Sequence, residues 1–265
     1  WTPAGNIDDL DQVTVADLEA FYRTYYVPNN AVLVIAGDAE PETAFALARR
    51  YFGHLEARPL PPKAPFELPD AGSSWSIELN LPIQLPVIVG GYLIPGVAHE
   101  DIPALEIASL ILSAGQSSRM YRSLVREQQV AVAAAGSAST YKDVGLFRTL
   151  ALYTPDRSAE EVQAAMLGVI SELATHPPTE MELEKARNQI LAGRTFQLDS
   201  MRGVAEGLAA AAVYLDDYRQ FYEELAEYER VTAEDVVRVV ETYLRPERFA
   251  AVQVTPQSES GSDQP

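Results

Sequence analysis

The sequence predicts an α+β protein that contains two related units, each a β-sheet backed by helices, with the first unit cut short. Three observations lead to this class. A stretch near the start recurs near the end, strand-like and helix-like segments follow one another in both copies, and a proline-rich stretch lies between them. The repeat relates residues 13–35 (VTVADLEAFYRTYYVPNNAVLVI) to residues 231–253 (VTAEDVVRVVETYLRPERFAAVQ), which align without a gap at an offset of 218.

The two copies of the repeat share the same local chemistry. Thr14 and Thr232 are N-cap candidates, and each has a carboxylate three residues later, which is typical of a capping box. Pro28 and Pro246 end each helix ahead of an apolar strand. Two ordinary capped helices could resemble each other by chance, but the match in cap, apolar face, stop and strand favours a duplication. Each helix carries apolar residues at i, i+3, i+4 and i+7, namely Leu18, Phe21, Tyr22 and Tyr25, and then Val236, Val239, Val240 and Tyr243.

The lengths of chain ahead of the two copies differ greatly. Most of the 158 residues at 73–230 precede the second helix–strand unit in its own domain, whereas only twelve residues precede the first. We therefore expect residues 1–55 to be the C-terminal part of a first domain and residues 73–255 to be a complete second domain. Residues 56–72 contain five prolines and are predicted to form a semi-rigid linker. Residues 256–265 are polar and are predicted to be disordered.

The first unit is expected to alternate helix, strand and helix. A helix at 13–26 ends before the turn at Pro28, and a strand of the buried type follows at 31–36. Pro41 suits the first turn of a further helix, which runs to about Phe52 and is closed by Gly53.

The second domain is expected to open with two strands and to close with the repeat. Four aliphatic residues lie on one face of its 143–153 strand, interrupted by Arg148: Val144, Leu146, Leu150 and Leu152. The predicted strands are 74–80, 86–94, 131–139, 143–153 and a last one ending near 254. The predicted helices are 101–113, one from the loop at 115–118 to about 128, then 158–175, 179–198, 200–214, 217–228 and the repeat helix.

Composition excludes several classes of function. The formal net charge is −18, which argues against nucleic acid and anionic membrane surfaces as partners, since both require a basic face. The chain has no cysteine and therefore no disulfide, thiolate chemistry or cysteine zinc site. The most apolar run, 85–98, is too short and too interrupted by proline and glycine to insert in a bilayer.

The sequence shows no catalytic or metal-binding pattern. Its histidines are His54, His99 and His176, and none has a second histidine three to five residues away, as zinc sites commonly require. His99 and Glu100 begin like a His-Glu-x-x-His helix, but the second ligand position holds Pro103. No nucleophile elbow or phosphate-binding loop is present. We therefore assign no catalytic, cofactor-binding or metal-binding residue within the chain.

Three strings carry a family likeness: YYVPNNAVLVIAGD at 25–38, ILSAGQSSRMYRSLVREQQVA at 111–131 and PPTEMELEKARNQI at 177–190. In this order and spacing the chain resembles the insulinase, pitrilysin and mitochondrial processing peptidase family of zinc metallopeptidases. The resemblance implies paired domains of about 220 residues, in agreement with the 218-residue offset. It also implies that zinc is held by a His-x-x-Glu-His helix of the first domain, upstream of this chain. The fragment itself is then expected to bind no zinc and to be inactive alone.

The chain departs from the family pattern at two positions. The second domain of single-chain active members supplies an arginine and, seven residues later, a tyrosine that hold substrate and stabilise the transition state. The alignment through LVREQQVAV places these at Val125 and Val132, which cannot donate a hydrogen bond. Tyr121 and Arg126 are close but out of register, and Val125 with Tyr121 and Leu124 is more simply a helix face in the core.

The resemblance implies the C-terminal portion of a metalloendopeptidase subunit that encloses and cleaves peptides in a clamshell with a partner. The partner would be a second family subunit or a further copy in a homo-oligomer. The alternatives are a non-catalytic subunit that binds substrate or partner, and a soluble interaction domain unrelated to proteolysis. A periplasmic or cell-envelope location is favoured if the source is bacterial.

Overall fold

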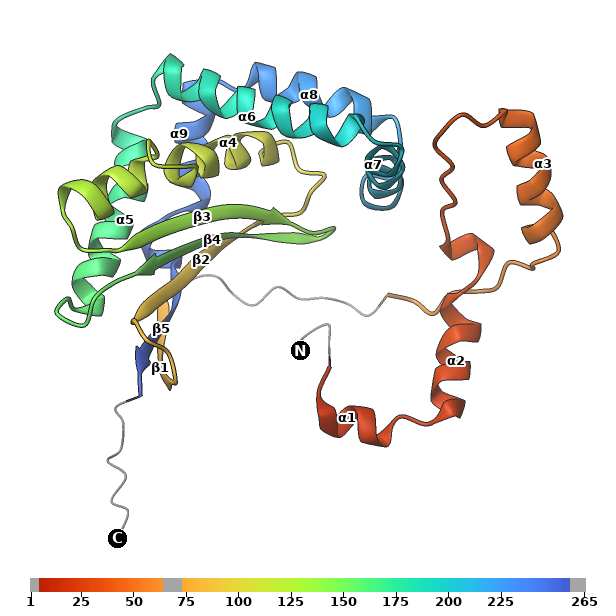
Figure 1. Ribbon diagram of the computed structural model, residues 1–265, viewed down its shortest axis with the longest axis horizontal. Helices are drawn as coiled ribbons and strands as arrows, with labels where there is room; N and C mark the ends of the chain where they lie inside the picture. The colour runs from red at the N-terminus through yellow and green to blue at the C-terminus, as the bar shows by residue number, and fades with distance from the viewer. Residues whose placement is uncertain (1–4, 64–72, 258–265) are drawn as a thin grey trace, which may run out of the picture.

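The computed structural model describes residues 5–63 and 73–257, and it shows a five-stranded sheet with helices packed on one side (Figure 1). The strand order is β1-β5-β2-β4-β3, in which β1 and β5 are parallel and the other neighbours are antiparallel. The predicted α+β class is therefore confirmed. Parts of the predicted linker, 64–72, and of the predicted tail, 258–265, lie outside the described residues.

The N-terminal part contains helices but no strand among the residues that the structure describes. Its elements are α1 (Ile7–Gln12), α2 (Val15–Tyr25), the 3-10 turn η1 (Pro28–Asn30) and α3 (Pro41–Phe52). The strand predicted at 31–36 is not formed: the segment is extended, but none of the five strands pairs with it. A strand needs a partner for its backbone hydrogen bonds, and an apolar pattern alone cannot supply one.

The second part follows the predicted order of elements, with bounds that shift by at most three residues except at the second helix. There, a π-helix (η2, Tyr121–Glu127) replaces most of the α-helix predicted to reach Gln128. Pro256, predicted to start the disordered tail, is the last residue of β5. The strands are β1 (Trp75–Leu81), β2 (Val87–Pro95), β3 (Ala133–Thr140), β4 (Val144–Leu152) and β5 (Ala250–Pro256). The helices are α4 (Ile102–Ser113), α5 (Ala159–Thr175), α6 (Glu180–Leu198), α7 (Met201–Tyr214), α8 (Gln220–Arg230), α9 (Ala233–Tyr243) and the 3-10 turn η3 (Pro246–Arg248).

The core lies between the sheet and the helices that cover one of its faces. Tyr92 of β2, Phe147 of β4 and Phe249 ahead of β5 point to this side and are almost fully buried. The rings of Tyr92 and Phe249 lie 5.2 Å apart. Helix α9 covers them with Val236 and Val239, both fully buried. The apolar side chains of the sheet and of α9 therefore belong to one continuous core.

The opposite face of the sheet is apolar, and no helix of residues 5–63 and 73–257 packs on it. We call it the open face and define it by eight side chains: Trp75, Ile77, Leu79, Leu81, Val89, Leu146, Arg148 and Leu150. The aliphatic face predicted for β4 is this one, whereas Phe147 and Ala151 of the same strand point to the core. Both faces of β4 are apolar, so period-two alternation could not tell which one the helices cover.

The repeat seen in the sequence recurs in the structure. Helices α2 and α9, and the turns η1 and η3, have bounds that differ by 218 positions at both ends. Both helices begin with a complete capping box, Thr14 with Asp17 and Thr232 with Asp235. Their environments differ, because the apolar face of α9 is buried whereas Phe21 of α2 is 56% exposed.

A glycine substitution tests the packing of the central strands. A Cβ at Gly90 of β2 would lie 2.2 Å from the buried Phe249 ring, whereas a Cβ at Gly168 of α5 would meet nothing within 4 Å. We expect Gly90→Ala to destabilise the protein by about 1–3 kcal/mol through overpacking. Gly168→Ala should stabilise it by about 0.5–1 kcal/mol, because alanine favours the helix. Urea unfolding measures both, and equal effects of the two substitutions would contradict this packing.

Candidate functional site

The three histidines lie on separate elements and do not form a metal site. His99 accepts a hydrogen bond from the Asp101 backbone N–H at 3.1 Å, and His176 lies 3.6 Å from the Glu172 carboxylate. His54 follows α3 in the other part of the chain. Among residues 5–63 and 73–257 no group of three histidine, aspartate or glutamate side chains could hold a metal ion. These residues therefore do not fit zinc, and we assign them no catalytic step.

Val125 and Val132 occupy different environments. Val125 lies on the π-helix and packs against the core next to the fully buried Leu124, as the sequence indicated. Tyr121 is half-buried but outside the core, and the Arg126 guanidinium lies 5.5 Å from the centre of its ring. Val132 is 49% exposed at the bend before β3. Neither valine offers a side-chain donor at these positions.

The π-helix is a feature that the sequence did not reveal. It ends with the Gln128 N–H donating to the Ser123 carbonyl at 2.9 Å, a five-residue step, and Gln129 follows with a φ of +51°. π-helices are rare and occur frequently at functional sites. No residue type marks one in a sequence, since the apolar pattern of the segment is equally compatible with an α-helix.

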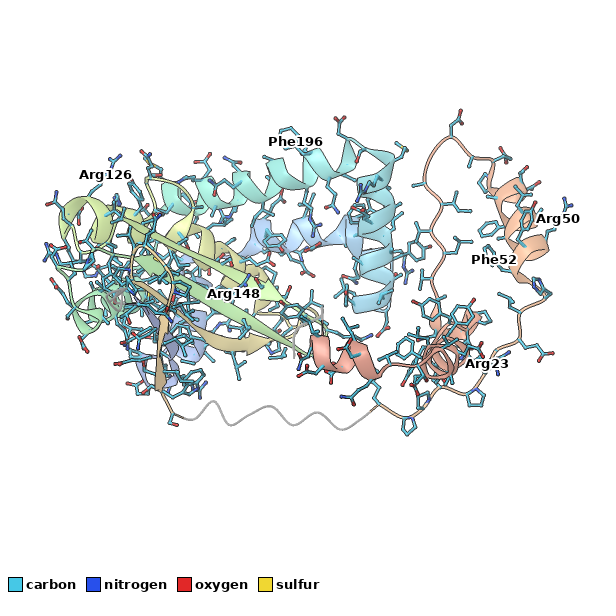
Figure 2. The ribbon with its side chains drawn as sticks, turned by 60° about the horizontal axis from the view of Figure 1, so that its bottom comes forward. Arg23, Arg50, Phe52, Arg126, Arg148 and Phe196 are labelled. Atoms are coloured by element: carbon cyan, nitrogen blue, oxygen red, sulfur yellow. The ribbon has the colours of Figure 1, made fainter. Side chains whose placement is uncertain are left out.

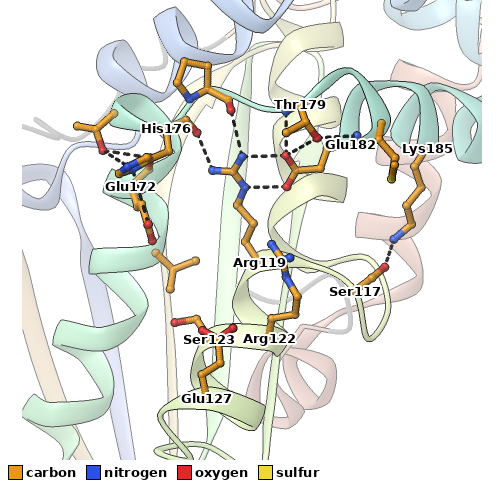
Figure 3. A pocket seen from close by; sticks show the side chains of 14 residues that line it. Ser117, Arg119, Arg122, Ser123, Glu127, Glu172, His176, Thr179, Glu182 and Lys185 are labelled. Carbon is orange, nitrogen blue, oxygen red and sulfur yellow. Dashed lines mark hydrogen bonds and ion pairs between the residues drawn. The ribbon is translucent and has the colours of Figure 1, made fainter.

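A cavity opens beside this π-helix (Figure 3). It has a volume of about 790 Å³ and lies between the 117–127 segment, the end of α5 and the start of α6. Its charged lining residues are Arg119, Arg122, Glu127, Glu172, Glu182 and Lys185.

Arg119 is the centre of the cavity wall. Its Nε and Nη2 donate to the two carboxylate oxygens of Glu182 at 2.9 Å each, and its remaining donors reach the carbonyls of His176 and Pro177 at 2.8 and 3.3 Å (Figure 3). Glu182 also closes the capping box of α6 with Thr179. The hydrogen bonds from Arg119 lower the pKa of Glu182 to about 2. One guanidinium thus joins three segments, the start of the π-helix, the end of α5 and the first turn of α6.

Two hydroxyl groups of the cavity lie beside a possible base. Thr175 Oγ1 lies 3.2 Å from His176 Nδ1, but it also donates to the Glu172 carbonyl at 3.3 Å, within the end of α5. Lys185 Nζ donates to Ser117 Oγ at 2.6 Å, which resembles the start of a serine–lysine pair. The lysine is exposed, however, and also donates to the Ala114 carbonyl at 3.2 Å. Both hydrogen bonds use the Lys185 ammonium as a donor, so they join α6 to the loop at 114–117. The polar residues of this cavity therefore serve the packing of the helices.

A second polar cluster lies where α4, α6 and α8 meet. The Tyr228 hydroxyl donates to Glu106 at 2.5 Å and lies 3.1 Å from Glu224, which also pairs with Arg194. Burial raises the pKa of Glu106 above its usual value. Each polar group here has a partner, so the cluster fixes the three helices relative to one another.

Replacing Glu182 by glutamine removes the ion pair and leaves the α6 cap in place, since glutamine also closes a capping box. We expect Glu182→Gln to destabilise the protein by about 1–3 kcal/mol at pH 7. Because the folded pKa of Glu182 is about 2 and its ordinary value 4.5, this stabilisation is present above pH 4.5 and is lost as the pH falls towards 2. The difference in unfolding free energy between Glu182→Gln and the wild type should therefore shrink as the pH falls from 4.5 towards 2.

Urea midpoints measured between pH 2 and pH 7 check this expectation. The matched control is Glu180→Gln, whose carboxylate pairs with Arg187 at 3.0 Å but is 77% exposed, so it should change stability by less than about 0.5 kcal/mol. Equal losses in the two variants, or a pH-independent loss in Glu182→Gln, would show that the Arg119 pair is not stabilising.

Comparisons with known proteins give related sequences and folds. A zinc protease named PqqE from Helicobacter pylori is 26% identical over 259 residues, which cover 97% of this chain and 58% of that protein. A protein named uncharacterized zinc protease Rv2782c from Mycobacterium tuberculosis is 24% identical over 95% of this chain and 58% of its own length. The crystal structure of a protease from Helicobacter pylori matches with a TM-score of 0.87 and 25% identity, covering 97% of this chain and 62% of that one.

The chain spans about 58% of the length of these two curated relatives. The family described as "Peptidase M16 inactive domain" matches residues 12–190, which is more than half of the sequence. The matched range contains the 25–38, 111–131 and 177–190 strings and most of the sheet. The chain therefore belongs to the Peptidase M16 inactive domain family.

Proposed function

We propose that this chain is the C-terminal portion of a zinc-dependent metalloendopeptidase subunit that encloses and cleaves peptides together with a partner subunit. The observation that carries this function is the family match over residues 12–190, in relatives that are named zinc proteases and are longer than this chain. Zinc belongs to the full-length protein or complex. When bound, it would activate a water molecule for attack on a peptide carbonyl.

The proposed division into domains follows the repeat. Residues 1–55 are the end of a first domain, 56–72 connect the domains, and 73–255 form the second. The exposed apolar face of α2 supports this division, since the same face of α9 is buried against a sheet. The unpaired segment at 31–36 supports it too, because its counterpart β5 lies between two strands.

The partner subunit supplies the hydrogen-bond donors that this chain lacks. A developing oxyanion on the peptide needs a donor placed in advance, and the aligned positions hold Val125 and Val132. One relative is named mitochondrial-processing peptidase subunit beta, from Caenorhabditis elegans, at 27% identity over 45% of this chain. Its name denotes one subunit of an assembly, which favours a partner carrying the arginine and tyrosine.

A soluble periplasmic or cell-envelope location is compatible with this function. No helix among the residues described here is long and apolar enough to cross a membrane. One protein of the same fold, PqqL from Escherichia coli, is titled a periplasmic protease (TM-score 0.77, 20% identity).

A second candidate function is a non-catalytic subunit that binds substrate or partner. The lack of hydrogen-bond donors at Val125 and Val132 agrees with a non-catalytic subunit as well as it agrees with a heterodimer. The sequence encoded ahead of Trp1 separates the two, since a His-x-x-Glu-His motif there supports the enzyme and its absence supports the non-catalytic subunit.

The proposal is tested by measuring peptide cleavage by three samples. These are the full-length protein, a family member encoded beside it, and their mixture. We expect cleavage only in the mixture, and its loss with a zinc chelator. Replacing the partner's arginine or tyrosine should lower the rate by on the order of 10²–10³, the cost of one oxyanion donor.

Full activity of the parent alone would contradict the division between subunits. Residues 1–265 alone should hold no stoichiometric zinc and cleave no peptide. Metal analysis after dialysis checks the first point, and zinc held by two of the three histidines would overturn it.

A further inference from the structure

We propose that the protonation of Glu106 controls how firmly α8 is held against α4, so that the joint between these helices weakens as the pH rises. The inference concerns the polar cluster where α4, α6 and α8 meet. No step of the proposed catalysis uses this cluster, and the inference does not depend on that catalysis.

Helix α8 is attached to the rest of the second part by few buried side chains. Of its eleven residues, only Phe221 and Tyr228 are buried. Phe221 lies over α7, where a Cβ at Gly207 would be 2.1 Å from its ring, whereas the Tyr228 hydroxyl reaches Glu106 of α4. The ribbon views show α8 beside α6, with α7 joining them at the end of α6 that carries Phe196 (Figures 1 and 2). The attachment of α8 to α4 therefore depends strongly on the polar contacts of Tyr228.

The Tyr228 hydroxyl lies between two carboxylates but has only one proton to donate. Its oxygen is 2.5 Å from Glu106 Oε2 and 3.1 Å from Glu224 Oε1. When both carboxylates are ionised, one of these contacts contains no proton and brings two acceptors together, which is unfavourable. One additional proton satisfies both contacts at once. The geometry therefore fits a cluster that binds a proton more readily than separate glutamates do.

The additional proton belongs on Glu106. Arg194 donates to Glu224 Oε2, so both oxygens of Glu224 act as acceptors. Glu106 forms no ion pair within residues 5–63 and 73–257. Burial raises the pKa of Glu106, and the hydrogen bond from Tyr228 offsets this only in part. When protonated, Glu106 donates to Tyr228 and Tyr228 donates to Glu224, so each contact contains one proton.

The cavity beside the cluster supplies no cation that would replace this proton. It has a volume of about 480 Å³, and its charged or titratable lining also includes His99, Glu100 and Glu227. The His99 ring accepts a hydrogen bond from the backbone of Asp101 instead. Helix α9 and strand β3 also pack on α4, but neither adds a charged side chain to the lining of this cavity.

Ionisation of Glu106 removes one proton from the chain of hydrogen bonds. The Tyr228 proton then serves either Glu106 or Glu224, and a negative charge lies on each side of one oxygen atom. Like charges at this separation repel, and the acceptor left without a donor is costly where it is partly buried. Because Glu106 is on α4 and Glu224 on α8, this repulsion acts between the two helices. We expect it to open the C-terminal half of α8.

The raised pKa sets the direction of the pH effect. The stabilisation is fully present below pH 4.5, the ordinary pKa of glutamate, and is lost as the pH rises through the folded pKa of Glu106. Within this window the folding equilibrium constant falls about tenfold for each pH unit, the slope for one proton. The Arg119 pair behaves in the opposite way, because the stabilisation from Glu182 is lost below pH 4.5. The two effects therefore occupy different pH ranges.

Urea unfolding of the full-length protein between pH 4.5 and about pH 9 tests the proposal, since a buried glutamate can retain its proton almost to that limit. Glu106→Gln is the test variant, because its amide does not titrate and can still donate to Tyr228. We expect its stability to be similar to that of the wild type near pH 4.5. Above this pH the variant should become the more stable protein, by about tenfold in the equilibrium constant per pH unit until the folded pKa is passed.

The matched control is Glu227→Gln, since Glu227 lines the same cavity but is exposed. Its difference in stability from the wild type should not change with pH. Glu224→Gln is a second test variant, which serves if Glu106→Gln does not fold. Removing the neighbouring negative charge should shift the pH-dependent loss of stability to lower pH.

Hydrogen exchange of the wild type locates the effect within the fold. The amides of α8 should lose protection relative to those of α5, by about tenfold per pH unit over the same window. Helix α5 is the internal reference, because it contains no residue of the cluster. The ratio of the two helices also removes the common effect of pH on exchange chemistry.

Three outcomes would overturn the inference. A difference between wild type and Glu106→Gln that stays constant above pH 4.5 shows that Glu106 binds its proton no more tightly than an exposed glutamate. A Glu227→Gln profile like that of Glu106→Gln assigns the effect to the overall charge of the cavity. Equal loss of protection in α5 and α8 assigns it to global unfolding. None of these results depends on zinc or on peptide cleavage.

Discussion

The fold of the second part depends on one strand, β5, which comes last in the sequence and lies second in the sheet. It pairs with β1 on one side and β2 on the other, and so joins the edge strand to the remaining three. The buried Phe249 just ahead of β5 packs over Gly90 of β2. Helix α9 leads into the strand and is fixed to the start of α4 by Asp101, which accepts from Arg238 at 2.5 Å and from Tyr243 at 2.7 Å. The position of β5 is therefore set by buried contacts at several points.

The sequence predicted helix starts well where residues within one turn determine them. Pro41 marked the start of α3, and Thr179 with Glu182 marked the start of α6. The failures have tertiary causes. The segment at 31–36 has the composition of a strand but no neighbour to pair with. The sequence showed an aliphatic face on β4 but not which of its two apolar faces the helices cover, because only the position of the helices decides this.

The candidate site was less predictable than the fold. The bond from Arg119 to Glu182 spans 63 positions, and a single sequence gives no sign that the two side chains meet. The sequence did show that Val125 and Val132 lack donors, and it placed Val125 correctly against the core. It could not show the π-helix that carries Val125, since the choice between α and π geometry is made by the surrounding packing.

The central place of β5 also affects how the protein folds during synthesis. Trp75 of β1 pairs with Ala250, so the parallel edge of the sheet closes a loop of about 175 residues. Such long-range pairings form slowly, because the loop must be ordered before its contacts stabilise it. On the ribosome, β2, β3 and β4 can pair early, while β1 stays without its neighbour until the last strand has emerged. Until then β2 has an open edge and β1 has no partner, so unpaired apolar strands are exposed and prone to association during this interval.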